Sequence, residues 1–384
     1  MNIVHLVNGE TSVGAITSIK KLVNELSKNT KLDIKLICYN ATEIDGVNSN
    51  IEIIYTKLRF SKMLNLYSNK EITLLYFIIA CPFYLLLDLC NLQYIIIKNN
   101  ITIVHSHYLV DNFICSLLLK VKKVSHIRSI PNVDFFYGHG FKLFKFFIKT
   151  FSNAIIGISH AVLSDFSPLH SDFHVVYNGF SLKSKDLSVL DSNQRKELDL
   201  LDSLTDEGNF IVGAISRFNA NKGLELFVNI ASKVKLNDVK FIIVAPRSTK
   251  AENEYYDHLN LNSHPNIFYI GSFPNSCFVF EKFNLLIQPT LGREGFGNVI
   301  LEAQNYGVPV LSTNSGGPSE IIDNENGFIF DKSDVDNFVN TILELKLDKE
   351  KYARLSKNSM INSQASRFKF ESTINLITNI YRNL

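Results

Sequence analysis

Short runs of apolar residues alternate with amphipathic stretches along most of the chain. The apolar runs have the length and the β-branched or aromatic content of strands and cover 2–7, 32–39, 101–107, 153–159, 173–179, 210–216, 239–246, 266–272, 283–290 and 308–313. The intervening segments 15–28 and 221–235 carry apolar residues at helical spacing. This alternation is typical of parallel sheets with crossover helices. Runs such as "FIIV" are apolar at consecutive positions, as in strands that are covered on both faces.

The strand–helix cycle stops in one polar stretch and then starts again. With 384 residues, the chain is long enough for two domains. We therefore predict an α/β protein with two doubly wound, Rossmann-like domains that face each other across a cleft. The expected bounds are 1–180 for the first domain, 181–208 for a linker with one exposed helix, 209–365 for the second domain and 366–384 for a C-terminal helix. Ligands of such sheets bind beyond the carboxyl ends of the strands.

Composition narrows the class of protein. A hydrophobic share of 46% with 20% charged residues is typical of a folded, soluble chain. The formal charge of +2, without a long basic run, gives no reason to expect nucleic acid as a partner. The five cysteines are scattered without metal-ligand spacing, and the first apolar run is too short for a signal peptide. We expect a cytoplasmic protein with reduced thiols.

Two segments complicate the cytoplasmic prediction. Residues 72–91 are nearly all apolar but contain Pro82 and Asp88, so a buried or interfacial helix is favoured over a membrane-spanning one. The second segment, 141–151, combines phenylalanines with lysines at helical spacing. It fits either a helix packed on its own domain or a basic, aromatic face that rests on the inner surface of an anionic membrane.

The stretch "REGFGNVILE" carries the clearest chemistry. It places Glu294 in a loop that follows a predicted strand and Glu302 one turn into the next helix. Gly295 and Gly297 let the backbone come close to a ligand, and a helix start with Asn298 as the expected N-cap offers free amide donors to an anion. Two carboxylates so placed would contact different parts of one elongated ligand.

The segment 284–330 resembles the most characteristic stretch of the retaining glycosyltransferases of family four, which have the GT-B fold. Those enzymes carry Glu, seven residues and Glu within "E-G-F-G-x-x-x-x-E", followed by "A-x-x-x-G-x-P-V" and a Gly-Gly loop. This chain reads "EGFGNVILEAQNYGVPVLSTNSGGPSEII". The resemblance is close over the second domain and looser over the first.

The resemblance implies a role for each acid. Glu294 would bind hydroxyl groups of the donor sugar, and Glu302 would hold the ribose hydroxyls of the nucleotide. The backbone at Phe296, Gly297 and Asn298 would approach the sugar and the diphosphate. A carboxylate suits a vicinal diol because it accepts two hydrogen bonds at once.

Two cations follow the first strand of the second domain. Arg217 and Lys222 lie in "SRFNANKG", and the family carries an Arg and a Lys at similar spacing. Paired cations stabilise the charge that develops on a diphosphate leaving group. Since the chain also lacks an Asp-x-Asp motif at a strand end, we expect no metal and no other cofactor.

The first domain gives weaker signals. Gly14, in the loop after the first strand, stands where the family has a glycine-rich loop. His126, in "VSHIRS", matches a family histidine near the donor sugar. In "VHSHY", His107 is expected to border the acceptor and His105 to be structural.

These features predict a retaining, metal-independent glycosyltransferase. It would move a hexose or N-acetylhexosamine from a nucleotide sugar, first of all a UDP-sugar, to a glycan or lipid-linked acceptor in surface polysaccharide synthesis. Another GT-B enzyme of nucleotide sugars, such as an epimerase, is the alternative. A catalytically silent nucleotide-sugar binder or membrane scaffold is a third hypothesis. A dehydrogenase is disfavoured because neither half has G-x-G-x-x-G after its first strand.

Overall fold

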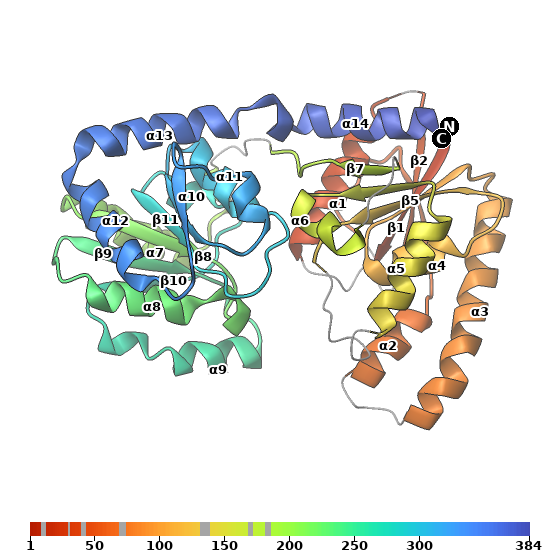
Figure 1. Ribbon diagram of the computed structural model, residues 1–384, viewed down its shortest axis with the longest axis horizontal. Helices are drawn as coiled ribbons and strands as arrows, with labels where there is room; N and C mark the ends of the chain where they lie inside the picture. The colour runs from red at the N-terminus through yellow and green to blue at the C-terminus, as the bar shows by residue number, and fades with distance from the viewer. Residues whose placement is uncertain are drawn as a thin grey trace. The chain divides into compact units, whose positions relative to one another are not determined.

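The computed structural model describes residues 1–8, 13–29, 31–39, 44–68, 74–130, 139–167, 172–180 and 186–384. The chain forms two compact units (Figure 1). The first unit contains residues 1–178 together with 371–384, and the second contains residues 179–370.

The first unit is built on a parallel sheet in the order β3-β2-β1-β4-β5-β6-β7. Its strands are β1 (Asn2–Asn8), β2 (Asp33–Tyr39), β3 (Glu52–Thr56), β4 (Ile103–Ser106), β5 (Lys122–Ile127), β6 (Ala154–Gly157) and β7 (Phe173–Val175). The strand order reverses between β1 and β4. This switch point is where doubly wound sheets leave a crevice at the carboxyl ends of their strands.

Helices cover both faces of this sheet (Figure 1). They are α1 (Val13–Leu26), α2 (Phe60–Ser68), α3 (Leu74–Lys98), α4 (Leu109–Ser116), α5 (His139–Phe151), α6 (His160–Leu163) and α14 (Phe370–Asn383). The last helix returns to the first unit, where Ile377, Ile380 and Tyr381 join the core formed with β1 and α1. Chain segments far apart in sequence thus complete one core.

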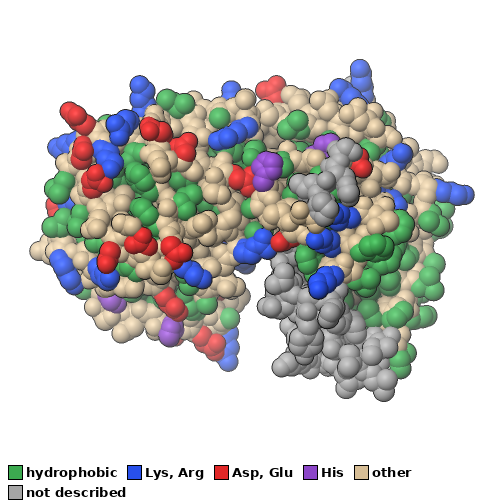
Figure 2. All heavy atoms as spheres, viewed as in Figure 1, with side chains coloured by type: hydrophobic (Ala, Val, Ile, Leu, Met, Phe, Trp, Pro, Cys, Tyr) green, Lys and Arg blue, Asp and Glu red, His purple; other side chains and the backbone are tan. Residues whose placement is uncertain are grey.

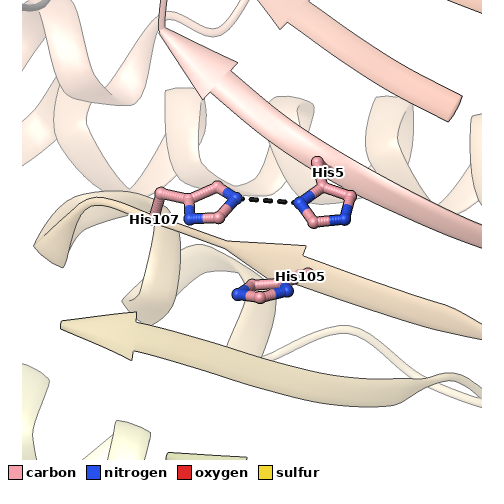
Figure 3. Close-up of side chains that lie close together, drawn as sticks. All are labelled: His5, His105 and His107. Atoms are coloured by element: carbon pink, nitrogen blue, oxygen red, sulfur yellow. Dashed lines mark hydrogen bonds between the residues drawn. The ribbon is translucent and has the colours of Figure 1, made fainter. Parts of the chain in front are cut away.

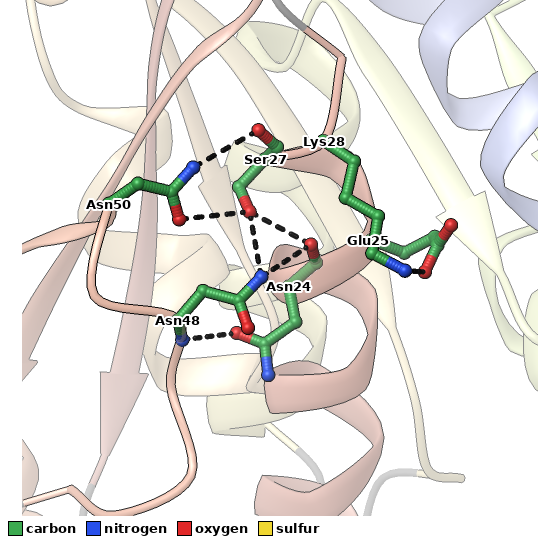
Figure 4. A network of polar contacts seen from close by, with 6 residues as sticks. All are labelled: Asn24, Glu25, Ser27, Lys28, Asn48 and Asn50. Atoms are coloured by element: carbon green, nitrogen blue, oxygen red, sulfur yellow. Dashed lines mark hydrogen bonds and ion pairs between the residues drawn. The ribbon is translucent and has the colours of Figure 1, made fainter.

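A polar network fixes the end of α1 to the segment before β3 (Figure 4). Asn48 donates its backbone N–H to Asn24 Oδ1 at 2.9 Å and its side-chain amide to Asn24 O at 3.0 Å. The Asn50 amide donates to Ser27 O at 3.3 Å. Because α1 runs back from the carboxyl edge of β1, this network lies at the opposite edge of the sheet from the switch-point crevice. We assign it a structural role.

The second unit has a parallel sheet in the order β10-β9-β8-β11-β12-β13. Its strands are β8 (Phe210–Ile215), β9 (Val239–Val244), β10 (Ile267–Ile270), β11 (Leu285–Gln288), β12 (Val310–Thr313) and β13 (Gly327–Phe330). Its helices are α7 (Ser192–Asp206), α8 (Leu224–Lys233), α9 (Lys250–His258), α10 (Cys277–Phe280), α11 (Asn298–Asn305), α12 (Val335–Leu347) and α13 (Lys349–Ser363). Here the order reverses between β8 and β11.

The two sheets confirm the predicted fold class, and each predicted strand run contains a strand. Strands β3, β5 and β13 were not predicted. The stretch 181–208, expected as a linker with one exposed helix, contains the helix α7, but the structure assigns this stretch to the second unit. A capping box at Asp191 starts this helix, and Leu198, Leu201 and Leu204 bury its apolar stripe.

Helix α3 leaves much of its apolar surface exposed. Over Ile79–Lys98 it is long and apolar enough to cross a membrane, and 28% of this stretch is buried. Its Asp88 is fully buried and accepts hydrogen bonds from the backbone N–H groups of Arg59 and Phe60, each at 2.8 Å. The acid inside this apolar helix therefore caps the start of α2.

Candidate active site

Two loops meet at the switch point of the second sheet. One follows β8 and contains the short 3-10 helix Ala220–Lys222, and the other joins β11 to α11. The carbonyl of Asn221 accepts hydrogen bonds from Leu291 N at 2.9 Å and from Gly292 N at 3.1 Å. These bonds join the loop that carries Lys222 to the loop that carries Glu294.

The join requires a glycine. Gly223 has φ +70°, and a Cβ added there would lie 1.9 Å from the carbonyl oxygen of Pro289. Both the left-handed backbone and the close approach exclude a side chain at this position. The glycine therefore fixes where Lys222 leaves the backbone.

Lys222 and Glu294 form an ion pair at this point. The Nζ–Oε2 distance is 2.8 Å, and the side chains are 34% and 18% exposed. The Gln288 amide, at the end of β11, donates to the same carboxylate oxygen at 3.5 Å. Arg217 follows β8 and is exposed, and it forms no ion pair with any residue that the structure describes. The structure therefore brings Lys222, but not Arg217, to Glu294.

The backbone of Glu294 is anchored to the Gly-Gly loop after β12. Glu294 N donates to Ser315 O at 2.7 Å, and Gly317 N donates to Glu294 O at 2.9 Å. A Cβ on Gly317 would lie 2.5 Å from both Gly295 O and the Cα of Phe296. Three loops thus hold the carboxylate at the carboxyl edge of the sheet.

The predicted N-cap of α11 is wrong by one residue. Gly297, with φ +94°, is the cap, and Asn298 is the first residue of the helix. An asparagine cap needs an extended backbone, whereas this turn enters the helix through the left-handed region. The Phe296 ring is 2% exposed, and its centroid lies 6.1 Å from that of the Phe368 ring, so Phe296 anchors this turn in the core of the second unit.

Glu302 has a different partner from Glu294. It lies on α11, and its Oε2 accepts a hydrogen bond from the Ser276 hydroxyl at 2.5 Å. The two acids therefore contact different residues: Glu294 pairs with Lys222, and Glu302 accepts from Ser276.

Three polar residues of this site were not predicted. Gln288 contacts Glu294, Ser276 contacts Glu302, and Ser315 accepts from Glu294 through its carbonyl. Gln288 Oε1 and Ser315 Oγ are buried and have no hydrogen-bond partner in the described part of the chain. Gln288 and Ser315 stand at or just after the ends of apolar strand runs, and this position was the only feature of the sequence from which they could have been predicted.

The first unit gathers four buried histidines at its own switch point. His5 on β1, His105 on β4, His126 on β5 and His107 just after β4 are each at most 2% exposed. Figure 3 shows three of them, with His5 Nδ1 lying 2.9 Å from His107 Nε2. We call these four residues the histidine cluster. The structure thus brings the predicted His107 and His126 together with His105, expected to be structural, and with His5, which was not predicted.

Gly14 lies in the first turn of α1. Residues 9–12 of the same predicted loop lie outside the described residues.

Burial keeps the histidine cluster neutral. Desolvation, followed by the charge of Arg128, lowers the pKa of His5 to about 3. Desolvation also lowers the pKa values of His105, His107 and His126 well below the ordinary value. Burial lowers the pKa of Arg128 to about 10, so this side chain is still a cation at neutral pH.

The histidine cluster has donor atoms close enough for a metal ion but an environment that opposes one. One ring nitrogen from each of His5, His105 and His107 lies within 4.8 Å of the others. Two nitrogen ligands of a tetrahedral zinc ion would be about 3.3 Å apart, whereas His5 and His107 approach to a hydrogen-bond distance. Arg128 donates to His107 Nδ1 at 3.0 Å and places a positive charge beside the site.

Comparison with known proteins identifies a domain in the second unit. Residues 196–360 match the family described as "Glycosyl transferases group 1". Over 129 residues the chain is 32% identical to the capsular polysaccharide biosynthesis glycosyltransferase CapM of Staphylococcus aureus, a match that covers 33% of this chain and 34% of CapM. Over 297 residues it is 26% identical to an uncharacterized glycosyltransferase of Methanocaldococcus jannaschii, with 76% and 78% of the two chains covered.

Solved structures share the architecture of the whole chain. The Anabaena protein HepE, in complex with UDP and glucose, matches with a TM-score of 0.75 at 17% identity over 100% of both chains. A glycosyltransferase from Rickettsia africae matches with a TM-score of 0.77 at 17% identity, over 100% of this chain and 98% of the other. At these identities the likeness establishes the fold, which is GT-B.

Proposed function

We propose that this chain, which carries a group 1 glycosyltransferase domain within a GT-B fold, is a retaining glycosyltransferase that resembles family four. It transfers a hexose or N-acetylhexosamine from a nucleotide sugar, first of all a UDP-sugar, to a glycan or lipid-linked acceptor in surface polysaccharide synthesis. The observation that carries the proposal is the Lys222–Glu294 pair, held by three loops at the switch point of the second sheet. Two comparisons support this substrate class: CapM is described as a glycosyltransferase of capsular polysaccharide biosynthesis, and HepE was solved in complex with UDP and glucose.

In this proposal the second unit binds the donor. Glu294 accepts hydrogen bonds from sugar hydroxyls, and Glu302 holds the ribose diol. Lys222, released from Glu294 as the donor enters, and the exposed Arg217 stabilise the diphosphate as its charge develops. The leaving phosphate helps to deprotonate the acceptor hydroxyl, so the chain supplies no nucleophile and needs no metal.

A panel of nucleotide sugars tests the proposal. Slow hydrolysis of one donor, and transfer to an added acceptor, are expected with and without EDTA. The anomeric configuration of the product, read by NMR, is expected to match that of the donor. Isomerised free donor without transfer would favour the epimerase alternative. Donor binding without any turnover would favour the silent binder, and loss of activity that magnesium or manganese restores would exclude metal independence.

The first unit is proposed to rest on an anionic membrane surface. On α3, Ile79, Phe83 and Leu86 are 68%, 58% and 59% exposed. On α5, Leu143 and Phe146 are exposed beside Lys142, Lys145 and Lys149. Figure 2 shows hydrophobic side chains gathered over this part of the first unit, with basic side chains next to them.

Helix α2 lies between the two helices. Phe60 of α2, which packs against α3, lies 6.4 Å from Phe144 of α5. An exposed apolar surface bordered by lysines fits the boundary between acyl chains and anionic headgroups. The apolar surface supplies insertion, and the lysines supply attraction that salt screens.

Vesicle pelleting tests this surface. The protein is expected to pellet with vesicles that contain phosphatidylglycerol, and less so at high salt or when the three α5 lysines are changed to Glu. The matched control changes three exposed lysines of the second unit, Lys196, Lys332 and Lys357, to Glu. Equal loss in both triple variants, or no pelleting of the unchanged protein, would exclude a membrane-docking role for α3 and α5.

A further inference from the structure

Gln288 is a buried glutamine at the end of β11, next to the loop that carries Glu294. It is 7% exposed, and its backbone carbonyl accepts a hydrogen bond from the Ser312 hydroxyl at 3.3 Å. A Cβ added to Gly297 would lie 3.2 Å from Gln288 Oε1 and 3.4 Å from Nε2. The amide of Gln288 therefore lies between the backbone of Gly297 and the carboxylate of Glu294.

The carboxylate fixes the direction in which this amide points. Gln288 Nε2 lies 3.5 Å from Glu294 Oε2. If the amide were reversed, its oxygen would face the carboxylate oxygen, and a carboxylate that is paired with a lysine can only accept hydrogen bonds. Two acceptors would then repel each other. Nε2 is therefore the amide atom that faces Glu294.

This direction leaves the other amide atom unsatisfied. Gln288 Oε1 is buried and has no hydrogen-bond partner among the residues that the structure describes. A buried acceptor without a partner lowers stability, and native proteins contain few of them. Packing alone does not account for such a side chain, because a methionine has a similar length and would fill the same place without an unsatisfied oxygen.

A second glutamine of the same unit shows the contrast. Gln304 lies on α11 and is fully buried. Its Nε2 donates to Asn326 Oδ1 at 3.0 Å, and its Oε1 accepts from the side-chain amide of Asn362 on α13 at 2.8 Å. Both amide atoms of Gln304 thus stabilise the unit. Gln288 directs its one contact at Glu294 instead.

Lys222 and Gln288 donate to the same oxygen of Glu294. The lysine, at 2.8 Å, is closer than the glutamine, at 3.5 Å. Lys222 is 34% exposed on a loop, whereas Gln288 is anchored in the sheet. If an anion draws Lys222 away, Glu294 loses its closer donor and Gln288 remains. Hydrogen bonds in active sites often shorten when the ligand is in place.

We infer that Gln288 is a positioning residue that holds the Glu294 carboxylate in place once Lys222 has turned to the diphosphate of the ligand. The identity of the ligand rests on the proposed function. An amide is neutral, so it orients the carboxylate without neutralising it. Glu294 thus keeps its negative charge for the moment when positive charge builds on the sugar ring.

Kinetics of Gln288→Met separate this role from a structural one. Loss of a hydrogen bond to a charged group should lower kcat by roughly tenfold and leave the donor KM nearly unchanged. The melting temperature should stay the same or rise, because the substitution removes an unsatisfied oxygen. A lower melting temperature with unchanged kcat would make Gln288 a structural residue and overturn the inference.

Gln304→Met is the matched control. It removes the same amide from the same unit, together with the hydrogen bonds to Asn326 and Asn362. It is expected to lower the melting temperature and to keep kcat. Equal losses of kcat in Gln288→Met and Gln304→Met would show that kcat responds to either buried glutamine, and would contradict a specific role for Gln288.

A double-mutant cycle tests whether Gln288 acts through Glu294. In the Glu294→Ala background there is no carboxylate to position. Adding Gln288→Met to this background should therefore lower kcat no further. A further loss of roughly tenfold would mean that Gln288 acts on another group, and it would exclude the proposed role.

The contact can also be measured without turnover. In ¹H–¹⁵N spectra of the full chain, the side-chain amide of Gln288 is identified by its loss in Gln288→Met. Its proton signal is expected to move downfield in Lys222→Met, where Glu294 is left to the amide, and when UDP binds to the unchanged protein. A signal that stays in place in Lys222→Met, or when UDP binds, would overturn the inference. If no nucleotide sugar is turned over, the proposed function fails, and these shifts still decide the role of Gln288.

Discussion

The two switch points of this molecule stand at equivalent places in their sheets and use opposite chemistry. Between β1 and β4 the first unit buries neutral imidazoles, one of which accepts a hydrogen bond from the cation Arg128. Between β8 and β11 the second unit keeps an ion pair in partly exposed loops. Ions remain near water because their desolvation is costly, whereas imidazoles can be buried in their neutral form.

The difference predicts which conditions affect each unit. The second unit depends on charge, which salt and conservative substitution alter. The first unit depends on the neutrality of its buried histidines, which acid alters. Four measurements, ordered from the largest expected effect to the smallest, test this contrast.

Acid should destabilise the first unit before the second. A histidine whose pKa is lowered on folding binds its proton more tightly when unfolded, so stability falls as the pH drops below about 6.5. With a folded pKa of about 3, His5 alone lowers the unfolding free energy by about 2 kcal/mol at pH 5. Hydrogen exchange followed by mass spectrometry should show earlier loss of protection in β1 and β4 than in β8 and β11.

One residue of the first unit provides a control with the opposite sign. Burial raises the pKa of Asp111 to about 7, so its contribution to stability falls as the pH rises between about 4 and 7. Asp111→Asn removes this contribution and should make the loss of stability in acid steeper. Equal acid sensitivity of both units would contradict the contrast between them.

Glu294→Gln should lower kcat by roughly 10²- to 10³-fold, the scale for a group whose contacts strengthen in the transition state. Unfolding does not explain such a loss, because a partly exposed ion pair contributes about 1 kcal/mol or less. Steady-state kinetics with varied donor, together with a melting curve, separate the two effects. Unchanged kcat would remove Glu294 from the reacting centre.

Gly223→Ala should destabilise the second unit and displace Lys222. The left-handed backbone costs about 1–2 kcal/mol for a side chain, and the clash with Pro289 adds about 1–3 kcal/mol. Gly208 is the matched control, since it has φ +78° and open space around its Cβ position. Urea unfolding of Gly223→Ala and Gly208→Ala separates the steric cost from the backbone cost. Equal losses of stability in the two variants would show that the loops do not need the close approach of Gly223 to the Pro289 carbonyl.

Glu302→Gln should mainly raise the donor KM. A group that holds the ribose binds the ground state and the transition state about equally. A lost charged hydrogen bond of about 1.5–3 kcal/mol corresponds to roughly ten- to a hundred-fold in affinity. Calorimetry with the bare nucleoside diphosphate measures this change in affinity. Weakened binding in Glu294→Gln, with none in Glu302→Gln, would exchange the two assignments.

The fold could be predicted from the sequence because buried parallel strands are continuous apolar runs. Strand β5 was missed because its residues Ser125 and His126 are polar yet buried, and so interrupt the apolar run. Strands β3 and β13 were missed because they are short edge strands next to turns.

The site was readable where its residues form a local motif. Glu294, Gly297 and Glu302 were predicted from one continuous stretch, and Lys222 from another. The hydrogen bond between His105 and Tyr381 joins residues 276 positions apart, and no local pattern marks it. The histidine cluster is built from such long-range contacts, so the sequence pointed to His126 but not to the residues that surround it.

The return of α14 to the first unit affects how the protein is made on the ribosome. Residues 371–384 are synthesised only after residues 179–370, a delay of roughly 10 to 40 s at about 5–20 residues per second. During that interval the nascent first unit lacks Ile377 and Tyr381, while every residue of the second unit has already been added. The usual order, in which the N-terminal domain folds first during translation, is therefore inverted. The core of the N-terminal sheet stays incomplete until α14 has been synthesised.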